Sequence, residues 1–189
     1  MAIGHVRNLN HCILIVSVCV CWSAAVDITV LTNVGNITGS VEDVNVGPNV
    51  VKVSTYLGIP FAEPPVGNLR FTKPQPKIWI HGGSFSVGSG RATTSSILAA
   101  YGEVIVVSVN YRLGVFGFLT SGNSAAGGNY GLWDQHLAIK WVKNNIEGFG
   151  GDATRITIFG ESAGSVSVML QALYPGNENM FQRVIAESA

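Results

Sequence analysis

Hydrophobic residues follow two spacings that alternate along most of the chain. Short apolar runs rich in β-branched residues have the length and composition of buried strands. They occupy residues 77–80, 103–110, 155–159 and 183–188. Between them, residues 93–101, 130–146 and 165–174 suit helices, of which 130–146 shows the clearest apolar face. Strands that alternate with helices predict a mostly parallel sheet with helices on both faces.

The pattern before residue 77 is different. From Asp27 to Thr55, short β-prone runs are separated by glycine turns, which predicts an antiparallel hairpin or meander at the edge of the sheet. Prolines then hold residues 58–67 in an extended loop. Farther along, Thr93 or Thr94 is a suitable cap for the first helix, and residues 111–128 form a glycine-rich loop.

The N-terminus has the features of a secretory leader. Arg7 precedes an apolar run at residues 12–22, and Ser23-Ala24-Ala25 supplies the small residues that a signal peptidase needs. We therefore expect a signal peptide at residues 1–25, one domain at 26–189, and a secreted protein. A signal anchor is the alternative, although the run is short for a bilayer, and no later run is long enough for a stable membrane span.

Composition narrows the function further. The chain is 47% hydrophobic and 12% charged, with equal numbers of basic and acidic residues, so it lacks the basic surface that nucleic-acid binding needs. All the cysteines (Cys12, Cys19 and Cys21) lie in the leader, which leaves residues 26–189 without a disulfide or a thiolate metal site. We expect no metal and no cofactor. Asn36-Ile37-Thr38 is a glycosylation sequon at Asn36.

One motif suggests chemistry. Gly160–Gly164 has the pattern Gly-x-Ser-x-Gly at a predicted strand-to-helix junction, where a tight turn needs small flanks and would expose the Ser162 hydroxyl. An ordinary glycine turn is the alternative. A reactive serine also needs donors for the oxyanion that forms on an attacked carbonyl. The backbone N–H of Ala163 and the loop His81–Ser84, which also follows a strand, could supply them.

The order of these motifs resembles the type-B carboxylesterase and cholinesterase family, which has the α/β-hydrolase fold. The resemblance covers nearly all of residues 56–189 and includes the segments 58–67, 81–85, 110–119, 129–151 and 160–164. It implies a partial α/β-hydrolase fold in which Ser162 is the nucleophile. It also implies that the N–H groups of Gly83, Ser84 and Ala163 form the oxyanion hole, and that Glu161 is a buried carboxylate that helps to organise the catalytic histidine. The implied reaction is hydrolysis of a small carboxylic ester through an acyl-enzyme.

The chain departs from the family pattern at two points near the site. Ser84 stands where the family has a third glycine, which restricts the backbone of the oxyanion loop. The family's triad acid and histidine follow the nucleophile at a distance, whereas this sequence ends 27 residues after Ser162, so we expect both to be absent. His81 and His136 are interpreted as structural. We therefore expect the chain as given to be inactive.

A third departure concerns the sheet. Family members carry a long segment between the Lys-Pro-Gln-Pro motif and the strand before His81, but here Pro76 runs directly into Lys77. The absent piece normally brings the second strand of the sheet. We therefore expect Val104–Asn110 to lose its neighbour, and Val184–Ser188 to be an edge as well, which would favour aggregation.

Two other functions remain open. One is a non-catalytic, cholinesterase-like adhesion or binding protein, and the other is a short secreted isoform that acts as a binder. Relatives of the first kind usually lose the nucleophile, so the presence of Ser162 favours an enzyme.

Overall fold

The computed structural model describes residues 15–21, 29–32, 35–60, 80–90, 95–123 and 126–188. Its strands are β1 (Ile15–Cys21), β2 (Thr29–Thr32), β3 (Gly35–Thr38), β4 (Ser40–Val46), β5 (Asn49–Pro60), β6 (Val106–Val109), β7 (Thr157–Glu161) and β8 (Arg183–Glu187). Its α-helices are α1 (Ser95–Gly102), α2 (Gly114–Phe118), α3 (Tyr130–Asn145) and α4 (Ala163–Leu173), and two 3₁₀ turns lie at Ile146–Phe149 and Pro175–Asn177.

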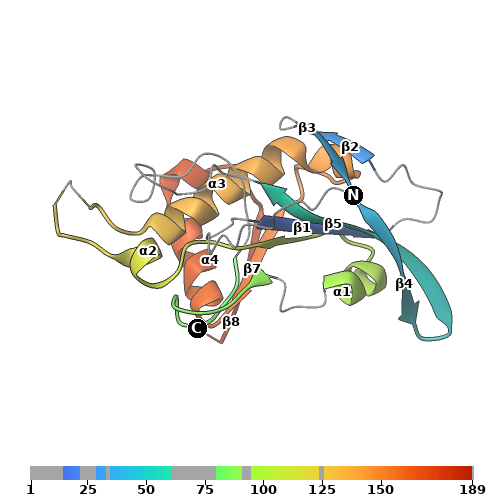
Figure 1. The fold of residues 1–189 in the computed structure, drawn as a ribbon, viewed down its shortest axis with the longest axis horizontal. Helices are drawn as coiled ribbons and strands as arrows, with labels where there is room; N and C mark the ends of the chain where they lie inside the picture. The colour runs from blue at the N-terminus through green and yellow to red at the C-terminus, as the bar shows by residue number, and fades with distance from the viewer. Residues whose placement is uncertain are drawn as a thin grey trace, which may run out of the picture.

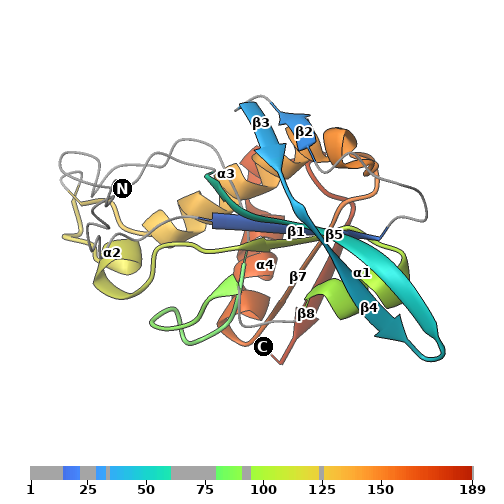
Figure 2. The ribbon, with the colours of Figure 1, turned by 45° about the vertical axis from the view of Figure 1, so that its right-hand side comes forward.

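The strands form three sheets. A four-stranded sheet has the order β4-β5-β1-β6, with every neighbouring pair antiparallel. The strands β2 and β3 form a separate antiparallel hairpin, and β7 pairs with β8 in parallel. The predicted mostly parallel sheet is therefore not confirmed, because β7–β8 is the one parallel pair among the described residues. The antiparallel hairpins predicted before Thr55 are confirmed, and Figure 2 shows the long β4–β5 ribbon that they include.

Helices cover both faces of the four-stranded sheet. Val53 of β5 and Val106 of β6 belong to one buried cluster with Ala99 of α1. Tyr56 and Val109, three positions further along the same strands, belong to a second cluster with α3. Because side chains alternate between the faces of a strand, an odd offset places the two clusters on opposite sides of the sheet. Figure 1 shows α1 and α3 on either side of β1 and β5.

Most predicted elements after residue 94 are present. The helices α1, α3 and α4 lie at the predicted places, and so do β7 and β8. The strand predicted at 103–110 is shorter, since β6 spans only Val106–Val109. The loop predicted at 111–128 contains α2, which is too short to show a hydrophobic period. The extended loop at 58–67 from Phe61 onward, the strand at 77–80 up to Trp79, and the cap at Thr93 or Thr94 lie outside the described residues.

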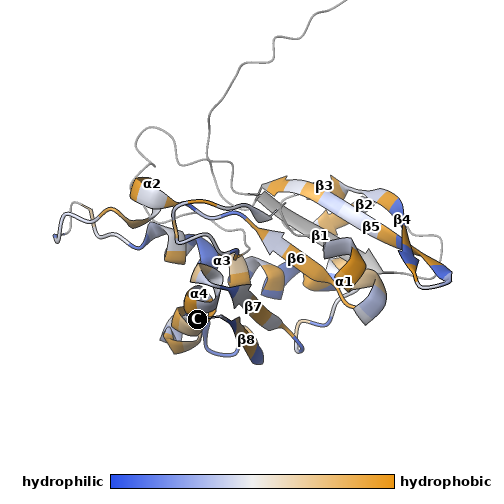
Figure 3. Ribbon diagram, turned by 90° about the horizontal axis from the view of Figure 1, so that it is seen from below, coloured by the Kyte–Doolittle hydropathy of each residue, from blue (hydrophilic) through white to orange (hydrophobic). Residues whose placement is uncertain are grey.

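The edge predicted at Val104–Asn110 is confirmed, because β6 ends the sheet of order β4-β5-β1-β6, but the strand that pairs with its other side was not predicted. The segment Ile15–Cys21, which the sequence assigned to the leader, forms β1 and pairs with β6 on one edge and β5 on the other. The second predicted edge is confirmed: β8 lies at the edge of its sheet and is exposed along its whole length. Figure 3 shows hydrophobic residues along α4 and in β8. Those exposed there are Val166, Met169, Leu170, Leu173, Val184 and Ile185.

Candidate active site

Ser162 occupies a sharp turn between β7 and α4. Its backbone has φ 55° and ψ −122°, a conformation that residues other than glycine rarely adopt. The turn is closed tightly, because a Cβ on Gly160 would overlap the carbonyl group of Gly164. The Ser162 N–H donates to the Glu187 carbonyl over 3.0 Å, and its carbonyl accepts from the Val166 N–H over 3.1 Å. The half-buried serine is thus held from both sides at the N-terminus of a helix.

The loop at residues 81–90 lies directly against this turn. A Cβ on Gly164 would lie 3.1 Å from the His81 carbonyl carbon and 3.3 Å from the Gly82 nitrogen. A Cβ on Gly82 would lie 2.6 Å from the Glu161 carbonyl oxygen. The contact at Gly82 leaves no room for a Cβ, and the one at Gly164 is so tight that the His81 backbone would have to move by a few tenths of an ångström. The structure therefore brings together the two segments in which the sequence placed the oxyanion donors.

We call residues 81–90 the oxyanion loop, after the role that the sequence predicts for it; this loop turns back on itself at Gly83. The N–H groups of Ser86 and Val87 both donate to the Gly83 carbonyl over 3.0 Å. Gly83 has φ 108°, and Ser84 and Phe85 follow with φ 54° and φ 58°. Ser84 thus adopts a positive φ despite its side chain, at a cost of order 1–3 kcal/mol. A serine at position 84 thus adds strain without preventing the turn.

The end of β6 anchors the oxyanion loop. The Tyr111 hydroxyl donates to the His81 carbonyl over 2.6 Å, and the two rings stack with centroids 4.6 Å apart. Burial raises the pKa of Tyr111 to about 12, which keeps it a donor. The Gly114 N–H donates to the Phe85 carbonyl over 2.7 Å. The sequence analysis missed this role of Tyr111; its only signal was an aromatic residue directly after a buried strand.

Both described histidines serve in packing, as the sequence predicted. The His81 Nδ1 lies 2.6 Å from the Gly82 carbonyl oxygen, and burial lowers the pKa of this imidazole. The His136 Nδ1 lies 2.8 Å from the Asn177 Oδ1, and its ring meets Trp133 and Tyr174 edge to face. Both imidazoles therefore have packing partners among the described residues.

A buried ion pair fixes the segment after β6 to α3. The Arg112 side chain donates from Nη2 to Asp134 Oδ1 over 2.8 Å and from Nε to Oδ2 over 2.9 Å. The Arg112 backbone N–H also donates to Oδ2 over 2.9 Å. Both side chains are almost completely buried. Burial raises the pKa of Asp134, and the bonds from Arg112 act against that rise.

A second polar network joins α3 to α4 behind the turn. The Gln135 amide donates to Ser167 Oγ over 3.0 Å, and the Gln171 amide donates to Gln135 Oε1 over 3.2 Å. The Asn177 side-chain amide donates to Gln171 Oε1 over 2.7 Å, which adds a third hydrogen bond to this network. Buried side-chain amides satisfied in this way set the position of one helix on the other. The sequence analysis did not identify this network, because its members are 32 to 36 residues apart between the two helices.

Two other predicted site residues, Glu161 and Asn36, are exposed to solvent, whereas Ser162 is half-buried. Glu161 was expected to be buried, and this is wrong: it is exposed at the end of β7, where β8 is the edge of the sheet. Asn36, the sequon residue, is exposed on β3.

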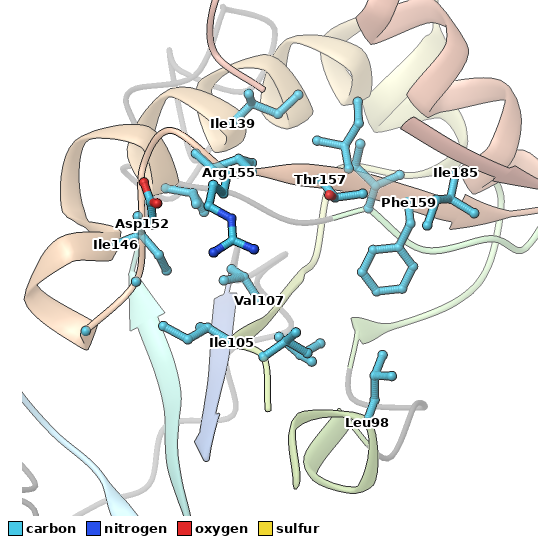
Figure 4. A pocket seen from close by; sticks show the side chains of 18 of the residues that line it. Leu98, Ile105, Val107, Ile139, Ile146, Asp152, Arg155, Thr157, Phe159 and Ile185 are labelled. Atoms are coloured by element: carbon cyan, nitrogen blue, oxygen red, sulfur yellow. The ribbon is translucent and has the colours of Figure 1, made fainter. Parts of the chain in front are cut away.

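A cavity of about 550 Å³ lies between β6 and β7, and Figure 4 shows Arg155, Thr157 and Phe159 around it. Neither the serine turn nor the oxyanion loop lines this cavity.

The model of the Carboxylesterase family matches residues 26–79 and 77–189 of this sequence. The chain belongs to the carboxylesterase family. The match is split at residues 77–79, next to the place where the sequence predicts an absent segment. A solved PNB esterase superposes on 85% of the chain with a TM-score of 0.71 and 35% identity, and a solved thermophilic PNB esterase gives the same TM-score at 33% identity. The carboxylesterase chain thus has part of the α/β-hydrolase fold.

This chain spans only a small part of the length of the curated proteins that it matches. The chain is 51% identical to bile salt-activated lipase from Bos taurus over 119 residues, which cover 59% of the chain and 20% of the lipase. It is 51% identical to neuroligin-2 from Mus musculus over 126 residues, which cover 66% of the chain and 15% of neuroligin-2. It covers 44% of each solved esterase chain. None of the helices in the described part of the carboxylesterase chain is long and apolar enough to cross a membrane.

Proposed function

We propose that this chain carries the nucleophile and oxyanion hole of a carboxylic ester hydrolase. The observation that supports this most strongly is the contact between the oxyanion loop and the serine turn, which rests on Gly82 and Gly164. A glycine turn without a catalytic role would need neither the strained φ of Ser162 nor a second glycine-rich loop against it. Backbone strain and close packing at the same point suggest a catalytic site rather than an ordinary turn between a strand and a helix.

The reaction proceeds by acyl transfer. Ser162 Oγ attacks the ester carbonyl carbon, and the carbonyl oxygen becomes an oxyanion held by the N–H groups of Gly83, Ser84 and Ala163. The N–H of Ala163 has no acceptor inside its helix, because the first N–H groups of an α-helix have none. The tetrahedral intermediate collapses, the C–O bond to the alcohol breaks, and the alcohol leaves with a proton. Water then attacks the acyl-serine and releases the carboxylic acid.

The proton of Ser162 needs an acceptor. His81 and His136 are both engaged in packing, and Glu161 is the carboxylate beside the nucleophile that would support a histidine. The proposed enzyme therefore takes its acid and histidine from outside this set of residues. The described part of the chain thus offers a nucleophile and oxyanion donors without a histidine placed as a base, and a site of that kind is slow beside an intact triad.

Hydrolysis of a p-nitrophenyl ester by the 189-residue chain tests the proposal, with Ser162→Ala as the matched control. Without an added base, both proteins should release p-nitrophenol at the same rate. Imidazole supplied in solution can act as the absent base, so wild type should then exceed Ser162→Ala by severalfold after subtraction of the imidazole blank. Equal rates in imidazole would contradict a nucleophilic role for Ser162. A Ser162-dependent burst without imidazole would contradict the absence of a base.

The second candidate is a non-catalytic binding protein of the same fold. The identities to a lipase and to neuroligin-2 are both 51%, so identity does not separate the two candidates. Equal rates of wild type and Ser162→Ala in imidazole would favour the binding protein.

We also propose that residues 1–25 direct the chain to secretion and that Asn36 is glycosylated. Arg7, the apolar run and Ala25 support the first proposal, and the exposure of Asn36 supports the second. Expression in a eukaryotic cell line tests both, by N-terminal sequencing of the secreted protein and by the loss of mass on glycosidase treatment. A chain that stays in the cytosol, or an unmodified Asn36, would contradict them.

A further inference from the structure

The leader and the sheet share one segment. Residues 15–21 lie inside the predicted signal peptide, yet they form β1, a central strand of the four-stranded sheet. We propose that Ile15–Cys21 is a structural strand of the chain that keeps its leader, so that cleavage after Ala25 removes the strand that joins the two halves of this sheet.

The pairing of β1 carries this proposal. On one edge, Val18 pairs with Tyr56 and Cys21 with Val53 of β5. On the other edge, Val18 pairs with Val107 and Val16 with Val109 of β6. Residues 16–19 thus have a strand on each side, and the only irregularity is a register shift between Val16 and Val18 on the β5 edge.

The strand order shows what cleavage would remove. In the order β4-β5-β1-β6, β5 and β6 are not neighbours, and β1 alone joins them by backbone hydrogen bonds within the described residues. The residues that flank β1 are among the most buried of the chain: Val53, Tyr56, Ile59 and Val109 are each at most 2% exposed. Without β1, two apolar strands would present unpaired N–H and C=O groups at buried positions, which is costly and favours aggregation.

The sequence of the segment suits both roles. Ile-Val-Ser-Val-Cys-Val-Cys is an apolar run of seven residues, which serves as the core of a signal peptide. It is also rich in β-branched residues and has the length of a strand buried between two helix layers. The two roles exclude each other in one molecule, because a strand paired on both edges cannot be presented to a signal peptidase. The segment therefore supports the sheet only in molecules that keep the leader.

Hydrogen–deuterium exchange with peptide-level mass spectrometry tests the proposal on residues 1–189 and 26–189. In the longer chain, amides of β5 and β6 should exchange at least tenfold more slowly than in the shorter one. Val18→Pro in the 189-residue chain should mimic the deletion, because proline removes an N–H and does not fit a central strand. Val18→Ile, which keeps the N–H and the β-branched shape, should leave the protection intact.

A peptide in trans covers the case in which residues 26–189 do not fold alone. A synthetic Ile15–Cys21 peptide with two lysines at each end should restore protection of β5 and β6, whereas the same peptide with Val18→Pro should not. The same protection of β5 and β6 with and without residues 1–25 would overturn the proposal. Equal effects of the two peptides, or of Val18→Pro and Val18→Ile, would overturn it as well.

Discussion

Gly82 lies so close to Glu161 that a Cβ at position 82 would be 2.6 Å from the Glu161 carbonyl oxygen and 3.0 Å from its Oε2. This contact joins the loop before α1 to the last residue before the serine. The two segments are 79 positions apart in the sequence and form one packed unit at the strand ends. A change that separates them would alter the position of the oxyanion donors relative to Ser162, even though it touches neither the serine nor a donor.

Gly82→Ala should destabilise the chain by about 1–3 kcal/mol, since the added methyl would force backbone apart at a close-packed contact. Gly127→Ala is the matched control, because no atom lies within 4 Å of a Cβ at that position. Urea denaturation measures both free energies of unfolding. Equal stabilities of the two variants would show that the loop and the turn are not packed as described.

Ser162→Gly should be more stable than Ser162→Ala by about 1 kcal/mol. Glycine relieves the strain of φ 55° and ψ −122°, worth roughly 1–3 kcal/mol, and loses about 0.5–1 kcal/mol of that gain to its greater freedom when unfolded. Both variants lack the hydroxyl, so their comparison isolates the backbone. Denaturant midpoints report the difference, and a more stable alanine variant would argue against a strained turn.

Asp134→Asn should cost about 3–5 kcal/mol, because it leaves the buried Arg112 guanidinium without its counter-charge. Asp43→Asn removes a partner from the exposed pair with Lys52, whose side chains are 59% and 70% exposed, and should cost about 1 kcal/mol or less. Thermal or chemical unfolding of the two variants provides the measurement. Similar small losses would mean that the Arg112–Asp134 pair does not hold the loop after β6 to α3.

His81 should make stability depend on pH below neutrality. Burial lowers the pKa of His81 in the folded chain, so the unfolded chain binds the proton more readily. The contribution of neutral His81 to the free energy of unfolding is complete above the ordinary histidine pKa of 6.5, and it is lost as the pH falls through the lower pKa of His81 in the folded chain. His81→Phe keeps a ring for the stack on Tyr111 but cannot titrate. Unfolding at pH 7.5 and 5.5 should therefore show a larger drop for wild type than for His81→Phe; equal drops would contradict the assignment.

Local sequence was sufficient for the elements around the serine. The periods of α3 and α4 and the Gly-x-Ser-x-Gly turn depend on neighbouring residues, and the structure has them where the pattern predicted. The glycines of the loop His81–Ser84 and its place after a strand predicted its contact with the serine turn, and the resemblance added the assignment of the individual N–H donors.

Long-range pairing was not accessible in the same way. An apolar run of seven residues is equally suited to a leader or to a strand, and only its partners in β5 and β6 distinguish the two in the folded chain. The exposure of Glu161 depends on what packs over the end of β7, and the bonds of Arg112 to Asp134 span 22 positions. Tertiary context decides each of these features, whereas sequence pattern reports only the intrinsic preference of a segment.

Covalent labelling of Ser162 tests the central claim most directly. The 189-residue chain is treated with a fluorophosphonate probe in imidazole buffer, digested, and analysed by peptide mass spectrometry, with Gly82→Ala as a variant that alters the oxyanion loop and leaves the serine in place. The account predicts a phosphonyl adduct on Ser162, little or none on the exposed Ser40 and Ser121, and slower labelling of Ser162 in Gly82→Ala. Labelling of Ser162 at the rate of Ser40 and Ser121 would contradict the claim that Ser162 is a nucleophile supported by the oxyanion loop.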